Sequence, residues 1–139
     1  MKTDYKNTLT GFAKDARKNS YSPYSGHAVG AALLCKSGKI YSGCNVENAA
    51  YGPTCCAERV ALFSAIADGE REFSAIAVVG NNPLCMPCGV CRQVFSEFCD
   101  GNFEILVEDK DGKIVSFTQN EILPYSFKLE KQTNGEENE

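Results

Sequence analysis

Residues 56–79 read C-A-E-R-V-A-L-F-S-A-I-A-D-G-E-R-E-F-S-A-I-A-V-V and combine two elements in one short segment. The first half is rich in Ala, Leu, Glu and Arg, residues that favour a helix. The pair Asp68-Gly69 is suited to end that helix, because glycine readily adopts the left-handed conformation found at helix C-termini. The apolar run 75–79 then predicts a short buried strand. A helix that leads into a buried strand is typical of an α/β fold.

The segment before residue 56 predicts one helix and two strands. Apolar residues recur every three or four positions up to the polar residues 18–20 and so share one helical face: Tyr5, Leu9, Phe12 and Ala16. Residues 27–35 are apolar on both alternating faces, as expected of a strand that is covered on both sides. A turn at 36–39 leads into a second strand at 40–44.

The segment after residue 79 predicts one more helix and two more strands. Pro87 precedes a helical pattern that closes at Gly101, and its shared face holds Cys88, Cys91, Val94, Phe95 and Phe98. Residues 103–107 and 113–117, joined by a D-K-D-G turn, predict the last two strands. The order of elements therefore predicts a three-layer α/β/α sandwich with a mixed five-stranded sheet.

The chain is expected to form one domain. A chain of 139 residues buries roughly 68% of the surface that its unfolded form exposes, and it therefore needs no disulfides to hold a core. We expect the domain to span residues 1–131, without repeats or linkers. Residues 132–139 are polar and acidic, and we expect them to form a disordered tail.

The charge and hydropathy exclude several classes of partner. The chain has 14 Lys+Arg against 18 Asp+Glu, a net charge of −4, and this argues against binding nucleic acid or anionic membranes. No run approaches the roughly 20 apolar residues of a membrane span, and residues 1–6 lack the apolar stretch of a secretory signal. We therefore expect a cytoplasmic protein that acts on a small neutral or polar substrate.

Eight cysteines are many for such a chain, and in a reducing compartment they indicate buried thiols, metal ligands or catalytic groups. In P-C-G-V-C, at 87–91, Cys88 and Cys91 lie three residues apart in a first helical turn, so both sulfurs point the same way. Cys56 begins the other helix in the same manner. If the two helices follow adjacent strands, their N-termini meet at one end of the sheet and three thiolates converge.

Three protein ligands without an obvious fourth describe a catalytic zinc that keeps one position open for water. Glu58 lies two residues after Cys56 in C-C-A-E-R, close enough to move protons yet turned away from ligation, and such a carboxylate contributes about 10²–10⁴-fold as acid and base. Three thiolates leave Zn²⁺ with a net charge of −1. Arg59 is our candidate for hydrogen bonding to the sulfurs to offset that charge, the alternative being a surface salt bridge.

A second interpretation of the cysteines is a structural or electron-transfer metal module. Cys85, Cys88 and Cys91 form C-x-x-C-x-x-C, which by itself resembles an iron–sulfur ligand run or a closed zinc site, with Cys55 as a possible further ligand. This interpretation leaves Glu58 without a purpose, and Pro87 puts Cys85 outside the helix that aligns the other two. We therefore disfavour it.

The spacing of C-x-E and P-C-x-x-C is a recorded signature of zinc nucleobase deaminases. The surrounding sequence extends the match: G-C-N-V-E-N-A-A-Y-G-P-T-C-C-A-E-R-V-A-L-F at 43–63, P-C-G-V-C-R-Q at 87–93, V-G-A-A-L at 29–33 and I-L-P-Y-S-F at 122–127. Together these segments closely resemble the small homotetrameric cytidine deaminases. The resemblance covers nearly the whole chain outside the tail.

The resemblance implies hydrolytic deamination of cytidine and 2′-deoxycytidine to the uridines, with release of ammonia, as a step of pyrimidine salvage. It also implies one zinc ion per subunit, held by Cys56, Cys88 and Cys91, and it makes Glu58 the residue that carries the proton from the water to the ring nitrogen and on to ammonia.

Two further parts of the site follow from the same resemblance. Asn45 and Glu47, two apart on one side of an extended segment, match the pair that holds the ribose hydroxyls. Phe127 matches an aromatic residue that reaches a neighbouring subunit's pocket and stacks on the base, the alternative being a local core plug. The resemblance therefore implies a homo-oligomer with shared active sites, expected to be a tetramer.

His27 is the one position where the chain departs from the family pattern. Family members usually carry phenylalanine there, close to the substrate, whereas related blasticidin-type deaminases tend to have histidine. Histidine preserves an aromatic face but can also hydrogen-bond a different ligand. We favour the interpretation that His27 is an aromatic replacement without effect on the substrate. Another aminated heterocycle, such as a blasticidin-type nucleoside, is the alternative substrate.

Overall fold

A mixed five-stranded sheet forms the centre of the protein, and the computed structural model describes residues 4–132. The strands are β1 (Gly30–Cys35), β2 (Ile40–Cys44), β3 (Phe73–Val79), β4 (Glu104–Glu108) and β5 (Ile114–Thr118). They lie in the order β2-β1-β3-β4-β5, and β3 and β4 form the parallel pair. The predicted mixed sheet is confirmed.

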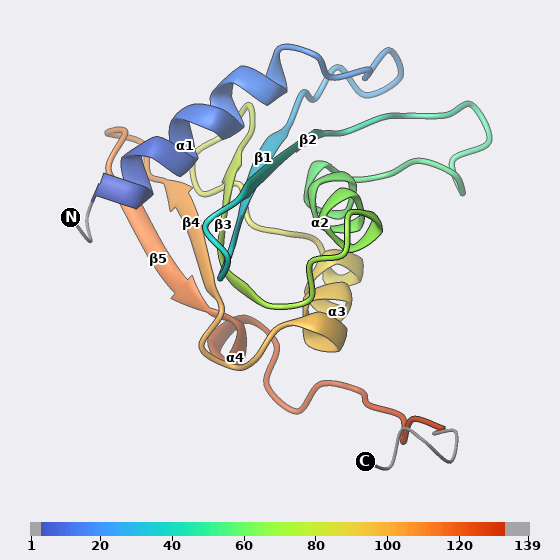
Figure 1. Cartoon of the computed structure of the whole chain (residues 1–139). Helices are drawn as coiled ribbons and strands as arrows, with labels where there is room; N and C mark the ends of the chain where they lie inside the picture. Colours follow the sequence, from blue (N-terminus) through green and yellow to red (C-terminus); the bar gives the residue numbers. More distant parts are fainter. Residues whose placement is uncertain (1–3, 133–139) are drawn as a thin grey trace.

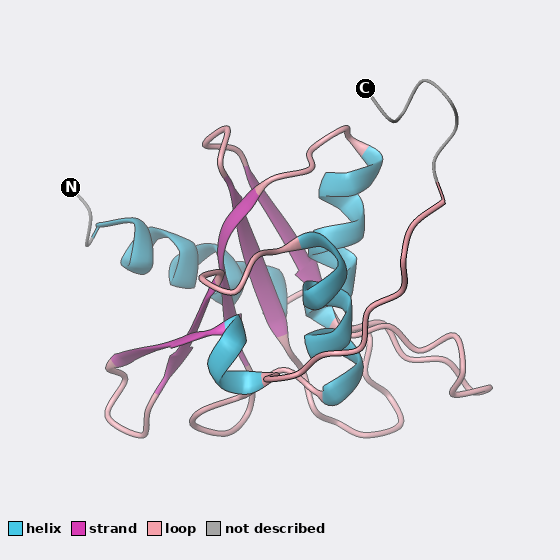
Figure 2. Cartoon of the chain, turned by 90° about the horizontal axis from the view of Figure 1, so that it is seen from below, coloured by secondary structure: helices cyan, strands magenta, loops and turns pink. Residues whose placement is uncertain are grey.

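Helices cover both faces of this sheet, as predicted. Helix α1 (Asp4–Arg17) lies on one face, and α2 (Ala57–Ala67) and α3 (Gly89–Phe98) lie side by side on the other (Figures 1 and 2). The buried residues accordingly form two clusters. Leu9 and Ala13 of α1 pack in the smaller cluster, while Ala61 and Phe95 belong to the larger cluster under α2 and α3.

Two glycines let the helices approach the sheet. A Cβ added at Gly30 would lie 2.0 Å from the carbonyl oxygen of Ala13, in α1. A Cβ added at Gly43 would lie 2.5 Å from the carbonyl oxygen of Ala57, in α2. Neither position has room for a larger residue, because the contact is with helix backbone. Close packing on both faces therefore depends on these two positions in neighbouring strands.

Helices α2 and α3 begin at the same end of the sheet, but not for the expected reason. They follow β2 and β3, which are not adjacent because β1 lies between them. Each of these strands is antiparallel to β1, so β2 and β3 run in the same direction. The condition of adjacent strands is not met, and the shared end of the sheet follows instead from the common direction of β2 and β3.

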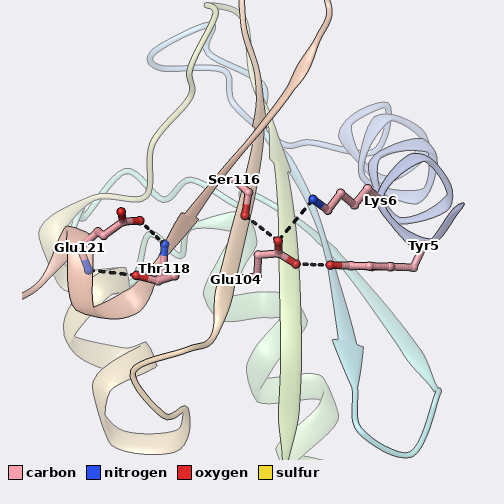
Figure 3. A network of polar contacts seen from close by, with 6 residues as sticks. All are labelled: Tyr5, Lys6, Glu104, Ser116, Thr118 and Glu121. Carbon is pink, nitrogen blue, oxygen red and sulfur yellow. Dashed lines mark hydrogen bonds and ion pairs between the residues drawn. The ribbon is translucent and has the colours of Figure 1, made fainter. Parts of the chain in front are cut away.

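Two local predictions differ from the structure. Residues 27–29 lie outside β1, which begins at Gly30, so the first strand is shorter than the apolar run. A fourth helix, α4 (Gln119–Ile122), was not predicted. It is capped by Thr118, whose side chain accepts from the Glu121 amide while the Glu121 side chain accepts from the Thr118 amide (Figure 3). A four-residue helix is too short to show periodicity.

Glu104 joins α1 to the β4–β5 edge of the sheet (Figure 3). It accepts hydrogen bonds from Tyr5 and from Ser116, the latter at 2.6 Å, and pairs with Lys6 at 3.5 Å. Burial alone would raise the pKa of Glu104, but the two hydrogen bonds and the Lys6 charge outweigh burial and lower it. The N-terminal helix is thus held to the sheet by an ionised carboxylate.

Within residues 4–132, no helix is long and apolar enough to cross a membrane. The predicted tail beyond Gln132 lies outside the described residues.

Candidate active site

Three cysteine sulfurs converge where α2 and α3 begin. Cys56 and Cys88 are the N-cap residues of the two helices, and Cys91 lies in the first turn of α3. The three sulfurs lie within 4.8 Å of one another, and the Cys56 and Cys88 sulfurs are 3.8 Å apart. Sulfurs bound tetrahedrally to zinc, each at about 2.3 Å, are about 3.8 Å apart. The spacing of this cluster therefore fits a zinc ion.

Both N-cap cysteines leave their sulfurs free for this cluster. Each has extended backbone angles and makes no side-chain capping hydrogen bond. Neither Cys55 nor Cys85 belongs to the cluster, which is the one group of three or more potential metal ligands found within residues 4–132. Three ligands leave one tetrahedral position open, as in catalytic rather than structural zinc sites.

The environment of Cys56 favours a thiolate. A hydrogen bond from Cys91 lowers the pKa of Cys56 to about 5, and Arg59 adds to this effect. The same hydrogen bond, together with burial, raises the pKa of Cys91. Burial also raises the pKa values of Cys55 and Cys85. The pKa of Cys56 is therefore lowered, whereas the pKa values of Cys55 and Cys85, outside the cluster, are raised.

Arg59 lies beside the cluster, in the first turn of α2. Its Nη2 donates a hydrogen bond to the Cys56 sulfur at 3.2 Å. Its Nε is buried and has no acceptor among the described residues. A guanidinium in this position withdraws negative charge from the sulfur.

Glu58 is almost completely buried, with 4% of its surface exposed. Burial raises the pKa of its carboxyl to about 7. A carboxyl with this pKa can accept and release a proton near neutral pH. Glu58 lies in the first turn of α2 and lines the same cavity as Cys56 and Cys88.

A cavity of about 320 Å³ brings together side chains from four parts of the chain. They come from the loop before β1, the loop after β2, the start of α2 and the loop before α3. The predicted residues that line it are His27, Asn45, Glu47, Cys56, Glu58 and Cys88. Three other lining residues, Ser25, Thr54 and Met86, were not singled out from the sequence, although Thr54 lies within the matching segment 43–63. Cys85, which also lines the cavity, was considered only as a metal ligand.

Asn45 holds the segment that carries His27. Its Nδ2 donates to the carbonyl oxygen of His27 at 2.8 Å, and its Oδ1 accepts from the amide of Val29 at 3.0 Å. The side chain is buried, with 9% of the residue exposed. The His27 carbonyl and the Val29 amide thus have a side-chain partner instead of a strand partner, and β1 begins only at Gly30.

Glu47 holds the other side of the same loop. One carboxylate oxygen accepts from the amides of Tyr24 and Ser25, at 3.0 and 3.1 Å, and the other accepts from the Ser25 hydroxyl. The hydrogen bond from the Ser25 side chain is the main cause of the lowered pKa of Glu47. Asn45 and Glu47 together fix the loop that places His27 at the cavity.

His27 faces Cys85 across a glycine. A Cβ added at Gly80 would lie 2.5 Å from the Cys85 sulfur and 3.5 Å from His27 Nε2. The absence of a side chain at Gly80 therefore lets both residues line the cavity.

Phe127 lies apart from these residues. It is 66% exposed, so the core-plug alternative is wrong for this chain. It follows α4 on the segment that passes below α3 in Figure 1. Gln93 Nε2, in α3, donates to the carbonyl oxygen of Phe127 at 2.9 Å. Lys128 Nζ also donates to the carbonyl oxygen of Ser96, at 3.0 Å. The structure thus attaches this segment to α3 and leaves the Phe127 ring in solvent.

Comparisons with known proteins agree with these features. A family model described as the cytidine and deoxycytidylate deaminase zinc-binding region matches residues 4–107. A cytidine deaminase of Sporosarcina psychrophila is 48% identical over 124 residues, which cover 88% of this chain and 90% of the relative. A blasticidin-S deaminase of Bacillus cereus is 33% identical over 111 residues, which cover 73% of this chain and 77% of the relative.

Solved structures give the same result. The crystal structure of a cytidine deaminase from Burkholderia pseudomallei superposes with a TM-score of 0.81 and 47% identity, covering 87% of this chain and 98% of the other. A cytidine deaminase from Mycobacterium tuberculosis gives a TM-score of 0.78 and 37% identity, covering 88% of this chain and 97% of the other.

Proposed function

The chain belongs to the cytidine deaminase family and is a hydrolytic deaminase; we propose that it converts cytidine and 2′-deoxycytidine to uridine and 2′-deoxyuridine with release of ammonia. The observation that carries this proposal is the buried carboxyl of Glu58 in one cavity with Cys56 and Cys88. A cysteine cluster alone would suit a structural metal, whereas an adjacent proton-transfer group suits hydrolysis.

Cys56, Cys88 and Cys91 are proposed to hold one Zn²⁺ per subunit, because their sulfur spacing suits that ion. When bound, zinc would supply a hydroxide nucleophile near neutral pH by lowering the pKa of a water to about 7. Arg59, through its hydrogen bond to Cys56, offsets the negative charge of the three thiolates.

Glu58 is proposed to transfer the protons of the reaction. It takes a proton from the attacking water and gives it to the ring nitrogen of cytosine, while the oxygen adds to the amine-bearing carbon. It then moves the second proton from the added hydroxyl to the amino group. The C–N bond breaks, ammonia leaves, and the added oxygen remains as the carbonyl of the uridine product. A carboxyl with a pKa of about 7 suits both directions of transfer.

Asn45 and Glu47 are proposed to bind the ribose hydroxyls. The Asn45 side chain donates one amide hydrogen to the carbonyl oxygen of His27, and we assign the other amide hydrogen to a hydroxyl of the sugar. The low pKa of Glu47 keeps its carboxylate ionised as an acceptor for hydroxyl groups. A site built around these groups discriminates against free cytosine, which would leave them unpaired. His27 lies at the same cavity and is proposed to contact the substrate.

The active form is proposed to be a homo-oligomer, with four subunits as our expectation. Phe127 is exposed and absent from the cavity of its own chain, which supports a role in a neighbouring subunit. We assign the deaminase domain to residues 1–131 and treat 132–139 as a tail. The eight free cysteines support a reducing compartment, which we infer to be the cytoplasm. A role in pyrimidine salvage is inferred from the proposed reaction alone.

The blasticidin-type alternative is not favoured. The relative named blasticidin-S deaminase is 33% identical, compared with 48% for the cytidine deaminase of Sporosarcina psychrophila.

The test is direct: zinc-loaded protein is incubated with cytidine, and uridine and ammonia are measured together. Equimolar formation of both supports the proposal. Turnover of blasticidin S but not of cytidine would overturn it.

A further inference from the structure

Arg92 connects the loop before α3 to α4. Its Nε donates to the carbonyl oxygen of Pro87 at 2.8 Å, and its Nη1 donates to the carbonyl oxygen of Ile122 at 3.0 Å. The contact with Pro87 reaches the residue directly before Cys88. Arg92 touches no sulfur through these bonds, so its place differs from that of Arg59.

The Pro87 carbonyl controls the orientation of Cys88. The carbonyl belongs to the planar peptide unit that leads into Cys88, so holding the oxygen fixes that plane. Proline has no N–H with which to anchor the loop by itself. Cys88 makes no side-chain capping bond that would hold its sulfur. On the C-terminal side of Cys88, its carbonyl oxygen accepts from the Arg92 amide at 3.0 Å. On the N-terminal side, the guanidinium holds the peptide plane that sets the direction from which the Cys88 sulfur reaches the cluster.

The other end of this connection is firmly held. Helix α4 begins with the Thr118–Glu121 capping box (Figure 3), and the Gln119 amide donates to the carbonyl oxygen of Phe103 at 2.9 Å. Gln119 is buried, with 3% of its surface exposed, and its Nε2 donates to the carbonyl oxygen of Arg92 at 2.9 Å. Arg92 thus bridges the loop to an anchored element and is itself held by that element.

We propose that Arg92 is a positioning residue for the metal ligand Cys88. Its guanidinium holds the Pro87 carbonyl in place relative to α4, and this carbonyl in turn orients Cys88. The inference rests on the proposed zinc site. Lysine cannot fully replace the residue, because its single ammonium lacks the planar fork that reaches two carbonyls at once.

The experiment measures zinc release from the zinc-loaded protein to a chromogenic chelator. Arg71→Met is the matched control, since Arg71 Nη1 also donates to two backbone carbonyls, those of Ile66 and Glu70, at the far end of α2. We expect Arg92→Met to release zinc roughly 10–100-fold faster than the parent, Arg92→Lys to lie between the two, and Arg71→Met to stay within about twofold. For cytidine, kcat should fall in Arg92→Met while KM stays within about twofold, because the proposed sugar and base contacts come from other loops.

Several results would overturn the inference. One is zinc release from Arg92→Met at the parental rate, and another is an equal acceleration in Arg71→Met, which would indicate general loosening. If Arg92→Met does not fold, Arg92→Lys serves for the same comparison, and parental release from it would also count against the role. A parent that holds no zinc would instead overturn the proposed metal site, and this inference with it.

Discussion

Arg59 and Cys56 lie three residues apart at the start of α2, and the Arg59 Nη2 donates to the Cys56 sulfur at 3.2 Å. One helical turn therefore supplies a cysteine of the proposed metal site, a buried carboxyl and a cation that hydrogen-bonds to that cysteine.

Arg59→Gln should weaken zinc binding. The substitution removes the guanidinium from the Cys56 sulfur, so the negative charge of the three thiolates is less well compensated. Loss of such a supporting contact typically costs about 10–100-fold in metal affinity. Chelator competition measures the affinity, and Arg59→Lys should lose less because it keeps the positive charge. An unchanged affinity for Arg59→Gln would show that Arg59 has no part in the metal site.

Gly43→Ala should destabilise the protein, since the added methyl group would lie 2.5 Å from the Ala57 oxygen and from the Ala61 nitrogen. These are backbone atoms of α2, so the helix must shift, at a cost of about 1–3 kcal/mol. Gly11→Ala is the control, because Gly11 lies in α1 with nothing within 4 Å, and it should gain about 0.5–1 kcal/mol. Urea unfolding measures both free energies. An equal change in the free energy of unfolding for the two variants would contradict the close approach of α2 to Gly43.

The Glu104 network should make stability depend on pH. The folded protein lowers the pKa of Glu104, so its stabilising effect is complete above the ordinary carboxyl value of 4.5 and is lost as the pH falls through the lowered pKa. Glu104→Gln should lose about 1 kcal/mol at pH 7 and become less sensitive to acid. Glu97→Gln, at an exposed ion pair with Lys131, is the control and should change little. Identical acid profiles for the parent and Glu104→Gln would rule out this role.

Phe127→Ala should raise KM without destabilising the fold. The side chain is 66% exposed in its own chain, so its removal should change the free energy of unfolding of the single subunit by less than about 0.5 kcal/mol. Loss of stacking on a base in a neighbouring subunit should raise KM for cytidine roughly tenfold. Tyr125→Ala, in the same segment and fully exposed, serves as the control. A KM unchanged by Phe127→Ala would mean that the ring does not reach the substrate.

The sequence predicted the cysteine cluster because its determinants are local. The i, i+3 spacing of Cys88 and Cys91 places both in one turn, and the composition after Cys56 identifies the second helix. The meeting of the two helices also required the relative directions of β2 and β3, which depend on pairing with β1 and are not readable from either segment.

Hydrophobic periodicity does not predict two other features of the structure. The apolar run 27–35 has the pattern of one strand, but the side chain of Asn45, distant in sequence, donates to the carbonyl oxygen of His27 and accepts from the amide of Val29. Helix α4 has no apolar stripe; its signal in the sequence is the T-x-x-E capping box at 118–121, and Gln119 is buried within it. Both features arise from hydrogen bonds of polar side chains, which leave no periodic signal in the sequence.

The most direct test compares ammonia release from cytidine by the zinc-loaded parent and by Glu58→Gln under identical conditions, with the zinc content of both measured. The amide keeps the size of the side chain but cannot transfer protons. Glu58→Gln should retain one zinc per subunit and lose about 10²–10⁴-fold in turnover. A zinc-loaded Glu58→Gln protein whose turnover stays within a few-fold of the parent would contradict the assignment of Glu58 as the proton-transfer residue.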